Sequence, residues 1–255
     1  MLEKIIVCLI AGFGAGIGTG FAGMSAAAVI TPMLATFLDM PAYQAVGIAL
    51  ASDVLASAVS SYTYGKNKNL DVKNGIIMML TVLLFTAIGS YAASFLPSET
   101  MGGFATVMTA FIGIRFLVRP VTATKETMAE QDPKKKIIKS VIGGIMIGFI
   151  CGFVGAGGGM MMLFVLTSIL GYELKTAVGT SVFIMTFTAF TGSVSHFALD
   201  GAPDWQCFVL CVVFTFIFAR IAAKIANRAS AKTLNRATGC ILVCLGVVTT
   251  VFKYI

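Results

Sequence analysis

The chain contains a long internal repeat, which is visible when the sequence is aligned with itself at an offset of 132 residues, from Lys4 to Lys136. The offset places Lys4-Ile5-Ile6 on Lys136-Ile137-Ile138, Gly20-Phe21 on Gly152-Phe153 and Ala45-Val46-Gly47 on Ala177-Val178-Gly179. A repeat of this kind predicts that both halves adopt the same arrangement of elements. We expect one integrated transmembrane domain, with repeats at 1–118 and 137–255 and a cytoplasmic linker at 119–136.

The composition indicates a chain that is solvated by lipid. Apolar residues account for 58% of the sequence and charged residues for 11%, about half the charged share of a soluble domain. Each half contains four apolar regions, which cover residues 4–38, 42–64, 74–96 and 100–118 and, in the second half, 137–171, 175–198, 205–227 and 233–252. The net charge of +7 comes from segment ends and loops, which is typical of anchoring in a lipid bilayer and not of nucleic-acid binding.

The first apolar region of each half is too long for a single helix across the membrane. About 20 residues are enough for one crossing, and both regions run well beyond that length. Glycines interrupt them at Gly20–Gly23 and at Gly152–Gly159, where we expect the helix to break. The sequence therefore predicts an all-α membrane protein in which each repeat is a Gly-broken helical hairpin followed by three transmembrane helices.

Loop charge predicts how these segments are oriented. Basic residues cluster at 65–73, in the linker at 119–136 and at 224–236, so these connections should be cytoplasmic. The acidic or neutral connections around Glu99 and at 199–205 should face the outside. Because 65–73 and its counterpart 199–205 then lie on opposite sides, we expect inverted-topology repeats, with ten helical segments and both termini outside.

The two glycine-rich breaks have the features of an anion-binding site. The second helix of each hairpin begins just after its break, so its first N–H groups have no intrahelical partner and its dipole end is positive. Glycine also lets a ligand approach these amides closely. The candidate substrate-binding residues in the breaks are Gly23, Met24 and Ser25 in the first half and Gly155, Ala156, Gly157, Gly158 and Gly159 in the second. Ser25 either caps its helix or contacts the ligand.

Other small and hydroxyl-bearing residues can serve helix packing or hydrogen bonding within a helix instead of ligand binding. The glycines at four-residue spacing should serve close packing of helices. They are Gly12, Gly16, Gly144 and Gly148. Thr180 and Ser181, on the helix after the second break, either contact the ligand or satisfy carbonyl groups of their own helix.

Asp53 is the one acidic residue inside an apolar region. It lies near the middle of the bilayer, where an ionised acid costs about 2.5–3.5 kcal/mol. Two interpretations stay open. Either Asp53 and its neighbour Ser52 couple transport to a proton or another ion, or a neutral or paired carboxyl holds its helix in place. The residue at the equivalent position of the second half is Met185, which does not titrate.

The sequence contains no pattern for a catalytic centre, a metal site or a cofactor. Its six cysteines lie in apolar stretches without a CxxC spacing, so we interpret them as packing residues. An intramembrane hydrolase would need Ser25 as nucleophile and His196, the one histidine, as base. The segment Gly23-Met24-Ser25-Ala26 lacks the second glycine of a nucleophile elbow, which argues against an enzyme.

The repeated motif resembles that of a known family. It reads Gly-Phe-Val-Gly-Ala-Gly-Gly-Gly at 152–159 and Ala-Val-Gly-Thr-Ser at 177–181, and it recurs in degenerate form at 20–25 and 45–47. This doubled motif is similar to that of the TauE/SafE family of membrane transporters, and the resemblance covers nearly the whole chain. The residues Met24-Ser25-Ala26-Ala27 depart from the family pattern, which is richer in glycine there.

The resemblance implies a multi-pass protein of a bacterial or archaeal plasma membrane that moves a small anion, often one that contains sulfur. Members of the family are described as exporters of sulfite or organosulfonates. We therefore expect a secondary transporter whose partners are a small anionic substrate, a coupling proton or ion, and the lipid bilayer. A passive anion channel and an uptake permease are the alternatives.

Overall fold

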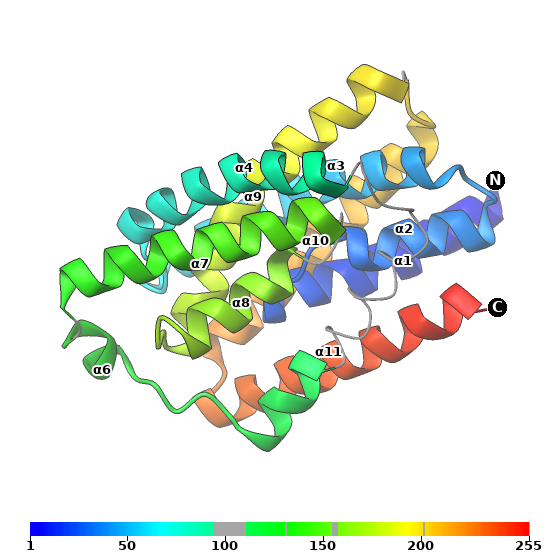
Figure 1. The fold of residues 1–255 in the computed structure, drawn as a ribbon. Helices are drawn as coiled ribbons and strands as arrows, with labels where there is room; N and C mark the ends of the chain where they lie inside the picture. The colour runs from blue at the N-terminus through cyan, green and yellow to red at the C-terminus, as the bar shows by residue number, and fades with distance from the viewer. Residues whose placement is uncertain (94–110, 131, 155–157, 201, 255) are drawn as a thin grey trace.

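The computed structural model describes residues 1–93, 111–130, 132–154, 158–200 and 202–254, and these ranges form a bundle of helices without strands (Figure 1). Six of the described helices are long and apolar enough to cross a membrane. Large apolar side chains on the outside of the bundle stay exposed, for example Leu84 at 61% and Phe190 at 58%. An apolar exterior suits lipid as the solvent, so the prediction of an all-helical membrane protein is confirmed.

The long apolar region of the first half folds as two helices, α1 (Leu2–Ala22) and α2 (Ala27–Phe37), as the glycines predict. Gly23 ends α1 in the left-handed conformation, with φ 58°, which glycine adopts without strain. The N–H groups of Gly23 and Met24 bond back to carbonyls in the last turn of α1 and so close the end of that helix. The chain then reverses into α2, and the two helices form a hairpin.

Where the structure describes them, the remaining helices follow the predicted apolar regions closely, and residues 94–96 and 100–110 of those regions lie outside the described residues. The first half continues with α3 (Ala42–Lys66), α4 (Val72–Ala93) and a helix over 111–118. The second half contains α7 (Pro133–Val154), α8 (Gly158–Ser168), α9 (Leu174–Asp200), α10 (Trp205–Arg228) and α11 (Ala231–Tyr254). The second long apolar region is thus also divided, between α7 and α8.

The expected linker contains a short helix, α6 (Lys125–Ala129), that is closed at its start by a capping box between Thr124 and Thr127. The next helix, α7, begins at Pro133, inside the stretch expected to be linker. Asp132 explains this start, because its Oδ1 accepts a hydrogen bond of 2.9 Å from the N–H of Lys134. Proline is also well suited to the first position of a helix, where its missing N–H costs nothing.

The two halves pack together through two corresponding pairs of helices, α1 along α10 and α4 along α7. Each pair is parallel and very close. A Cβ atom added to Gly16 would lie 2.7 Å from Phe218 Cβ on α10, and Gly12 is packed as tightly. Gly144 and Gly148 approach α4 in the same way. The packing interpretation of these four glycines is therefore confirmed.

The equivalent helices α3 and α9 pack against each other between these two pairs. Figure 1 shows that α1 and α7, the first helices of the two halves, run in opposite directions. The N-terminus and the end of α11 lie at the same end of the bundle. The first helices of the two halves therefore enter the bundle from opposite ends.

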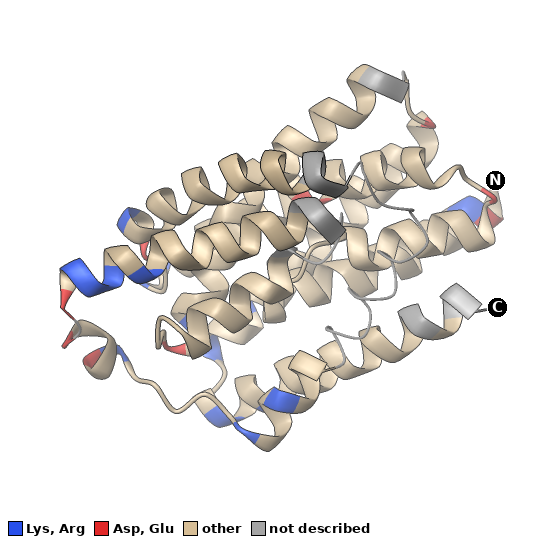
Figure 2. Ribbon diagram, in the orientation of Figure 1, with Lys and Arg blue, Asp and Glu red and all other residues tan. Residues whose placement is uncertain are grey.

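An ion pair lies at each end of the bundle. The Lys136 ammonium is 2.7 Å from Asp71 Oδ2 at the end that carries α6, and the Lys4 ammonium is 2.6 Å from Asp204 Oδ2 at the other end. Most lysine and arginine residues lie at the α6 end (Figure 2). The expected cytoplasmic loops thus share one end of the molecule.

Candidate functional site

The two glycine-rich breaks meet in the middle of the bundle. A Cβ atom added to Gly159, at the start of α8, would lie 2.5 Å from the carbonyl oxygen of Gly23 and 2.9 Å from the backbone nitrogen of Ser25. A side chain at position 159 would therefore collide with backbone, which does not yield easily. The structure thus explains a glycine here by the close approach of the two hairpins.

Ser181, on α9, lies between the two breaks. Its Oγ is 3.2 Å from the carbonyl oxygen of Gly23, 3.3 Å from that of Gly159 and 3.8 Å from the Met185 sulfur, so these three acceptors share its single proton. A Cβ atom on Gly23 would lie 3.1 Å from the same hydroxyl oxygen. Of the predicted site residues, Gly23, Ser25, Gly159 and Ser181 are therefore brought together.

Asp53, on α3, lies at the start of α2 and is almost completely buried. Its Oδ2 accepts a hydrogen bond of 2.7 Å from Ser25, and its Oδ1 accepts one of 2.9 Å from Ser57, one helical turn further along α3. The backbone N–H of Ala26 also donates to this carboxyl group. Ser25 in turn accepts a hydrogen bond from the N–H of Ala27, the first residue of α2.

These contacts show that the start of α2 already holds an acidic group of the protein itself. A carboxylate is the kind of ligand that the unpaired N–H groups and positive dipole end of a helix attract. At α8, the equivalent residue is Met185, and a Cβ on Gly159 would lie 2.5 Å from its sulfur atom. A thioether carries no charge, so the two helix starts differ in electrostatic character.

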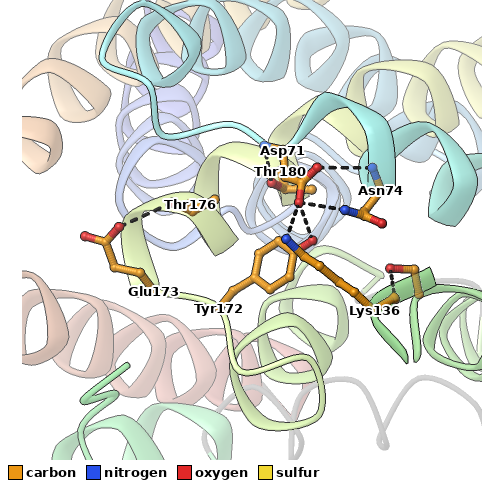
Figure 3. A network of polar contacts seen from close by, with 8 residues as sticks. Asp71, Asn74, Lys136, Tyr172, Glu173, Thr176 and Thr180 are labelled. Carbon is orange, nitrogen blue, oxygen red and sulfur yellow. Dashed lines mark hydrogen bonds and ion pairs between the residues drawn. The ribbon is translucent and has the colours of Figure 1, made fainter. Parts of the chain in front are cut away.

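Thr180 forms its hydrogen bond away from the two breaks. Its Oγ1 accepts a hydrogen bond of 3.2 Å from the N–H of Asp71, which joins α9 to the connection between α3 and α4 (Figure 3). The carboxylate of Asp71 also receives bonds from Asn74, Lys136 and Tyr172, at 2.8, 2.7 and 2.8 Å. The structure thus places Thr180 in a polar network at the α6 end of the bundle and not at the breaks.

The polar network keeps Asp71 ionised. Burial opposes the charge, but the hydrogen bonds from Lys136, Asn74 and Tyr172 outweigh it and hold the pKa of the Asp71 carboxyl below its ordinary value. Burial and the nearby Asp71 carboxylate raise the pKa of the Tyr172 phenol, so the phenol remains a hydrogen-bond donor. The Lys136 ammonium also lies 4.7 Å from the centre of the Tyr172 ring, within reach of a cation–π contact.

The other predicted residues have different positions. Ser52 donates a hydrogen bond of 2.8 Å to the carbonyl of Ile48 in its own helix, which is the plainer of the expected roles for such a hydroxyl. Met24 is buried, with its carbonyl bonded by Thr19. Gly158 begins α8. Gly155, Ala156 and Gly157 lie outside the described residues.

Sequence reasoning missed three hydroxyl groups that complete the site. Ser57 bonds Asp53, Tyr64 donates to the carbonyl of Gly20 at 2.9 Å, and Thr238 donates to that of Phe21 at 3.2 Å. The last two satisfy carbonyls at the end of α1 that have no helical partner. Of these three residues, the sequence pattern indicates only Ser57, because its spacing of four residues from Asp53 places both on one helix face.

Ser25 and His196 form hydrogen bonds with different partners. Ser25 donates to the Asp53 carboxyl, while the Nδ1 atom of His196 lies 3.2 Å from the carbonyl oxygen of Tyr43 at the start of α3. The described part of the chain also contains no group of three or more His, Cys, Asp or Glu side chains that could hold a metal ion.

Comparisons with known proteins identify the family of the chain. Residues 8–249 match the family model described as "Sulfite exporter TauE/SafE". The chain is similar to the probable membrane transporter protein YunE of Bacillus subtilis, with 23% identity over 95% of this chain and 96% of that protein. It is 24% identical to YdhB of the same organism, also named a probable membrane transporter protein, over 83% of this chain and 86% of that one.

A probable membrane transporter protein of the archaeon Methanocaldococcus jannaschii is 25% identical over 74% of this chain and 70% of its own. No solved structure matches the chain. These relatives are named as transporters and not as enzymes. With a family model that spans nearly its entire length, this multi-pass membrane protein belongs to the TauE/SafE family of membrane transporters.

Proposed function

We propose that the protein is a secondary transporter of small anions, with sulfite or an organosulfonate as substrate, and that the two halves work as inverted-topology repeats around one central site. The anion would bind where the two breaks meet, near Gly23, Ser25, Gly159 and Ser181. In the bilayer, half-helix ends at the midplane are a recurrent way to bind an anionic group. The family name supports sulfite as substrate and export as the direction.

One observation supports this proposal: the start of α8 lies against the break before α2, so the N-termini of the two helices lie close together. The start of α2 is bonded by Asp53, whereas Met185 stands at the equivalent place near α8. The α8 side is therefore the better place for a substrate anion. Its backbone N–H groups would replace water around the anion without a fixed cation, which gives reversible binding.

Asp53 is the candidate coupling residue, because its carboxyl group contacts Ser25 directly beside this region. An ionised Asp53 would repel a second anion nearby, and a proton on Asp53 would remove the repulsion. Proton binding and anion binding would then favour each other, by reciprocal linkage. A proton and an anion would then cross together, and the net flux would follow their combined gradients. Uptake is therefore the second candidate direction of transport.

The binding test is a panel of anions added to the purified full chain. Sulfite and a short alkylsulfonate should raise the melting temperature, while an uncharged sulfone of similar size should not. Gly159→Ala should abolish the effect, because its methyl group would collide with the backbone of Gly23 and Ser25 and push the two breaks apart. If none of the anions stabilises the wild-type protein, the proposed substrate class is wrong.

The transport test uses proteoliposomes with pH gradients imposed in either direction. A coupled transporter should show saturable flux that depends on the gradient, and Asp53→Asn should remove the pH dependence. Flux that never saturates and has no proton stoichiometry would identify a passive channel. An Asp53→Asn variant with unchanged transport and unchanged pH dependence would leave Asp53 as a residue that only holds its helix.

A further inference from the structure

A groove of about 600 Å³ lies on the surface between the second half of α3 and the middle of α9. Its walls include the rings of Tyr62, Phe183 and Phe187, and Lys66 lies at the end of α3. It is separate from the central site, where Asp53 and Ser181 face the interior of the bundle. The contacts described above do not use it.

The groove lies on the outer surface of the membrane-spanning bundle. Tyr62 is 72% exposed and Phe187 is 43% exposed, and both belong to helices that are long and apolar enough to span the bilayer. Water does not enter the hydrocarbon core, so a hollow on a lipid-facing surface must be filled by something apolar. Lipid acyl chains are the molecules present everywhere around such a surface.

The dimensions and charge of the groove point to one kind of lipid. From Ala58 to Lys66 it follows two turns of α3, or about 12 Å, which lies within one leaflet of a hydrocarbon core about 30 Å thick. Lys66 is the last residue of α3 and therefore lies at the depth of the lipid headgroups. A lysine at that depth attracts anionic headgroups, which are characteristic of the cytoplasmic leaflet.

We propose that the groove binds an anionic phospholipid, with one acyl chain along Tyr62, Phe183 and Phe187 and the headgroup phosphate at Lys66. The lipid would touch both helices that carry the central site, since α3 bears Asp53 and α9 bears Ser181. This binding site is independent of the proposed transport activity and would exist in a protein with any substrate.

The test measures lipid binding by the full chain in mild detergent. Phosphatidylglycerol and phosphatidylcholine with identical acyl chains are titrated separately, and bound lipid is counted by native mass spectrometry. Phosphatidylglycerol should bind more tightly, and Lys66→Gln should weaken it about fivefold, the effect of one lysine near an anionic headgroup. Lys73→Gln is the matched control, because it removes an exposed charge at the start of α4 and should have no effect.

A second pair of variants tests the apolar part of the groove. Ala58→Phe places a ring inside it and should abolish binding of both lipids, while Leu55→Phe adds a ring to the exposed side of α3 outside the groove and should not. Equal binding of the two lipids by the wild type, equal effects of Lys66→Gln and Lys73→Gln, or retained binding in Ala58→Phe would each overturn the proposal. A lipid-free dimer of the wild type that dissociates in Ala58→Phe would also overturn the proposal, since a second copy of the chain would then occupy the groove.

Discussion

The Lys136 ammonium lies 2.7 Å from the Asp71 carboxylate and joins the first helix of the second half to the connection before α4 in the first half. The equivalent lysine of the first half, Lys4, pairs in the same way with Asp204, just before α10. The two halves thus have equivalent lysine–aspartate ion pairs, which lie at opposite ends of the bundle. They differ in surroundings, since the side chains of Lys136 and Asp71 are 13% and 14% exposed and those of Lys4 and Asp204 are 37% and 27% exposed.

The difference in burial predicts different effects on stability. Asp71→Asn should lower the free energy of unfolding by about 2 kcal/mol, because hydrogen bonds to a charged acceptor are lost and Lys136 keeps a partly buried charge. Asp204→Asn is the control and should have a clearly smaller effect, since exposed ion pairs contribute little. Both are measured by thermal unfolding in the same detergent. Equal losses would show that burial does not decide the strength of these pairs.

Acid should weaken the protein through the same carboxylate. The pKa of Asp71 is lower in the folded state than in the unfolded chain, where it is about 3.9. Its contribution is therefore complete above about pH 5 and is lost progressively as the pH falls through the folded value. Melting temperatures between about pH 6 and pH 3 should decline less in Asp71→Asn than in the wild type. Parallel curves for the two proteins would contradict this assignment.

Gly159→Ala should destabilise the contact between the two breaks by about 1–3 kcal/mol, the usual cost of overpacking. Its methyl group would meet backbone atoms of Gly23 and Ser25, which are held by the hairpin. Gly192→Ala is the control on the same helix bundle, because its methyl would meet the end of the flexible Leu50 side chain at 3.0 Å. Thermal unfolding of the two variants should differ, and similar values would mean that the breaks adjust readily.

The orientation of the bundle can be tested by cysteine accessibility. Single cysteines at Lys68 and Ala202, in a chain whose six native cysteines are replaced, should react with a membrane-impermeant reagent from opposite sides. The basic loop should be labelled from the cytoplasm and the acidic one from outside. Labelling of both positions from the same side would exclude inverted-topology repeats.

The helices were largely predictable because their signals are local. A stretch of apolar residues and a glycine-rich interruption identify where α1 ends and where α2 begins, and Gly16 and Gly148 indicate close packing through their spacing alone. The role of Thr180 was not predictable. Its partner, Asp71, is distant in sequence, and only the packing of α9 against the connection after α3 brings the two together.

The amino-acid sequence alone determined that this protein is a membrane-spanning helical repeat with two glycine-rich breaks, since hydrophobic length and glycine content act within each segment. The tertiary structure alone decided that the breaks meet around Ser181 and that Asp53 occupies the start of α2. These facts depend on contacts between helices from both halves. A backbone N–H group donates to any suitably placed anionic group, so composition cannot reveal that the anionic group at the start of α2 is the carboxylate of Asp53.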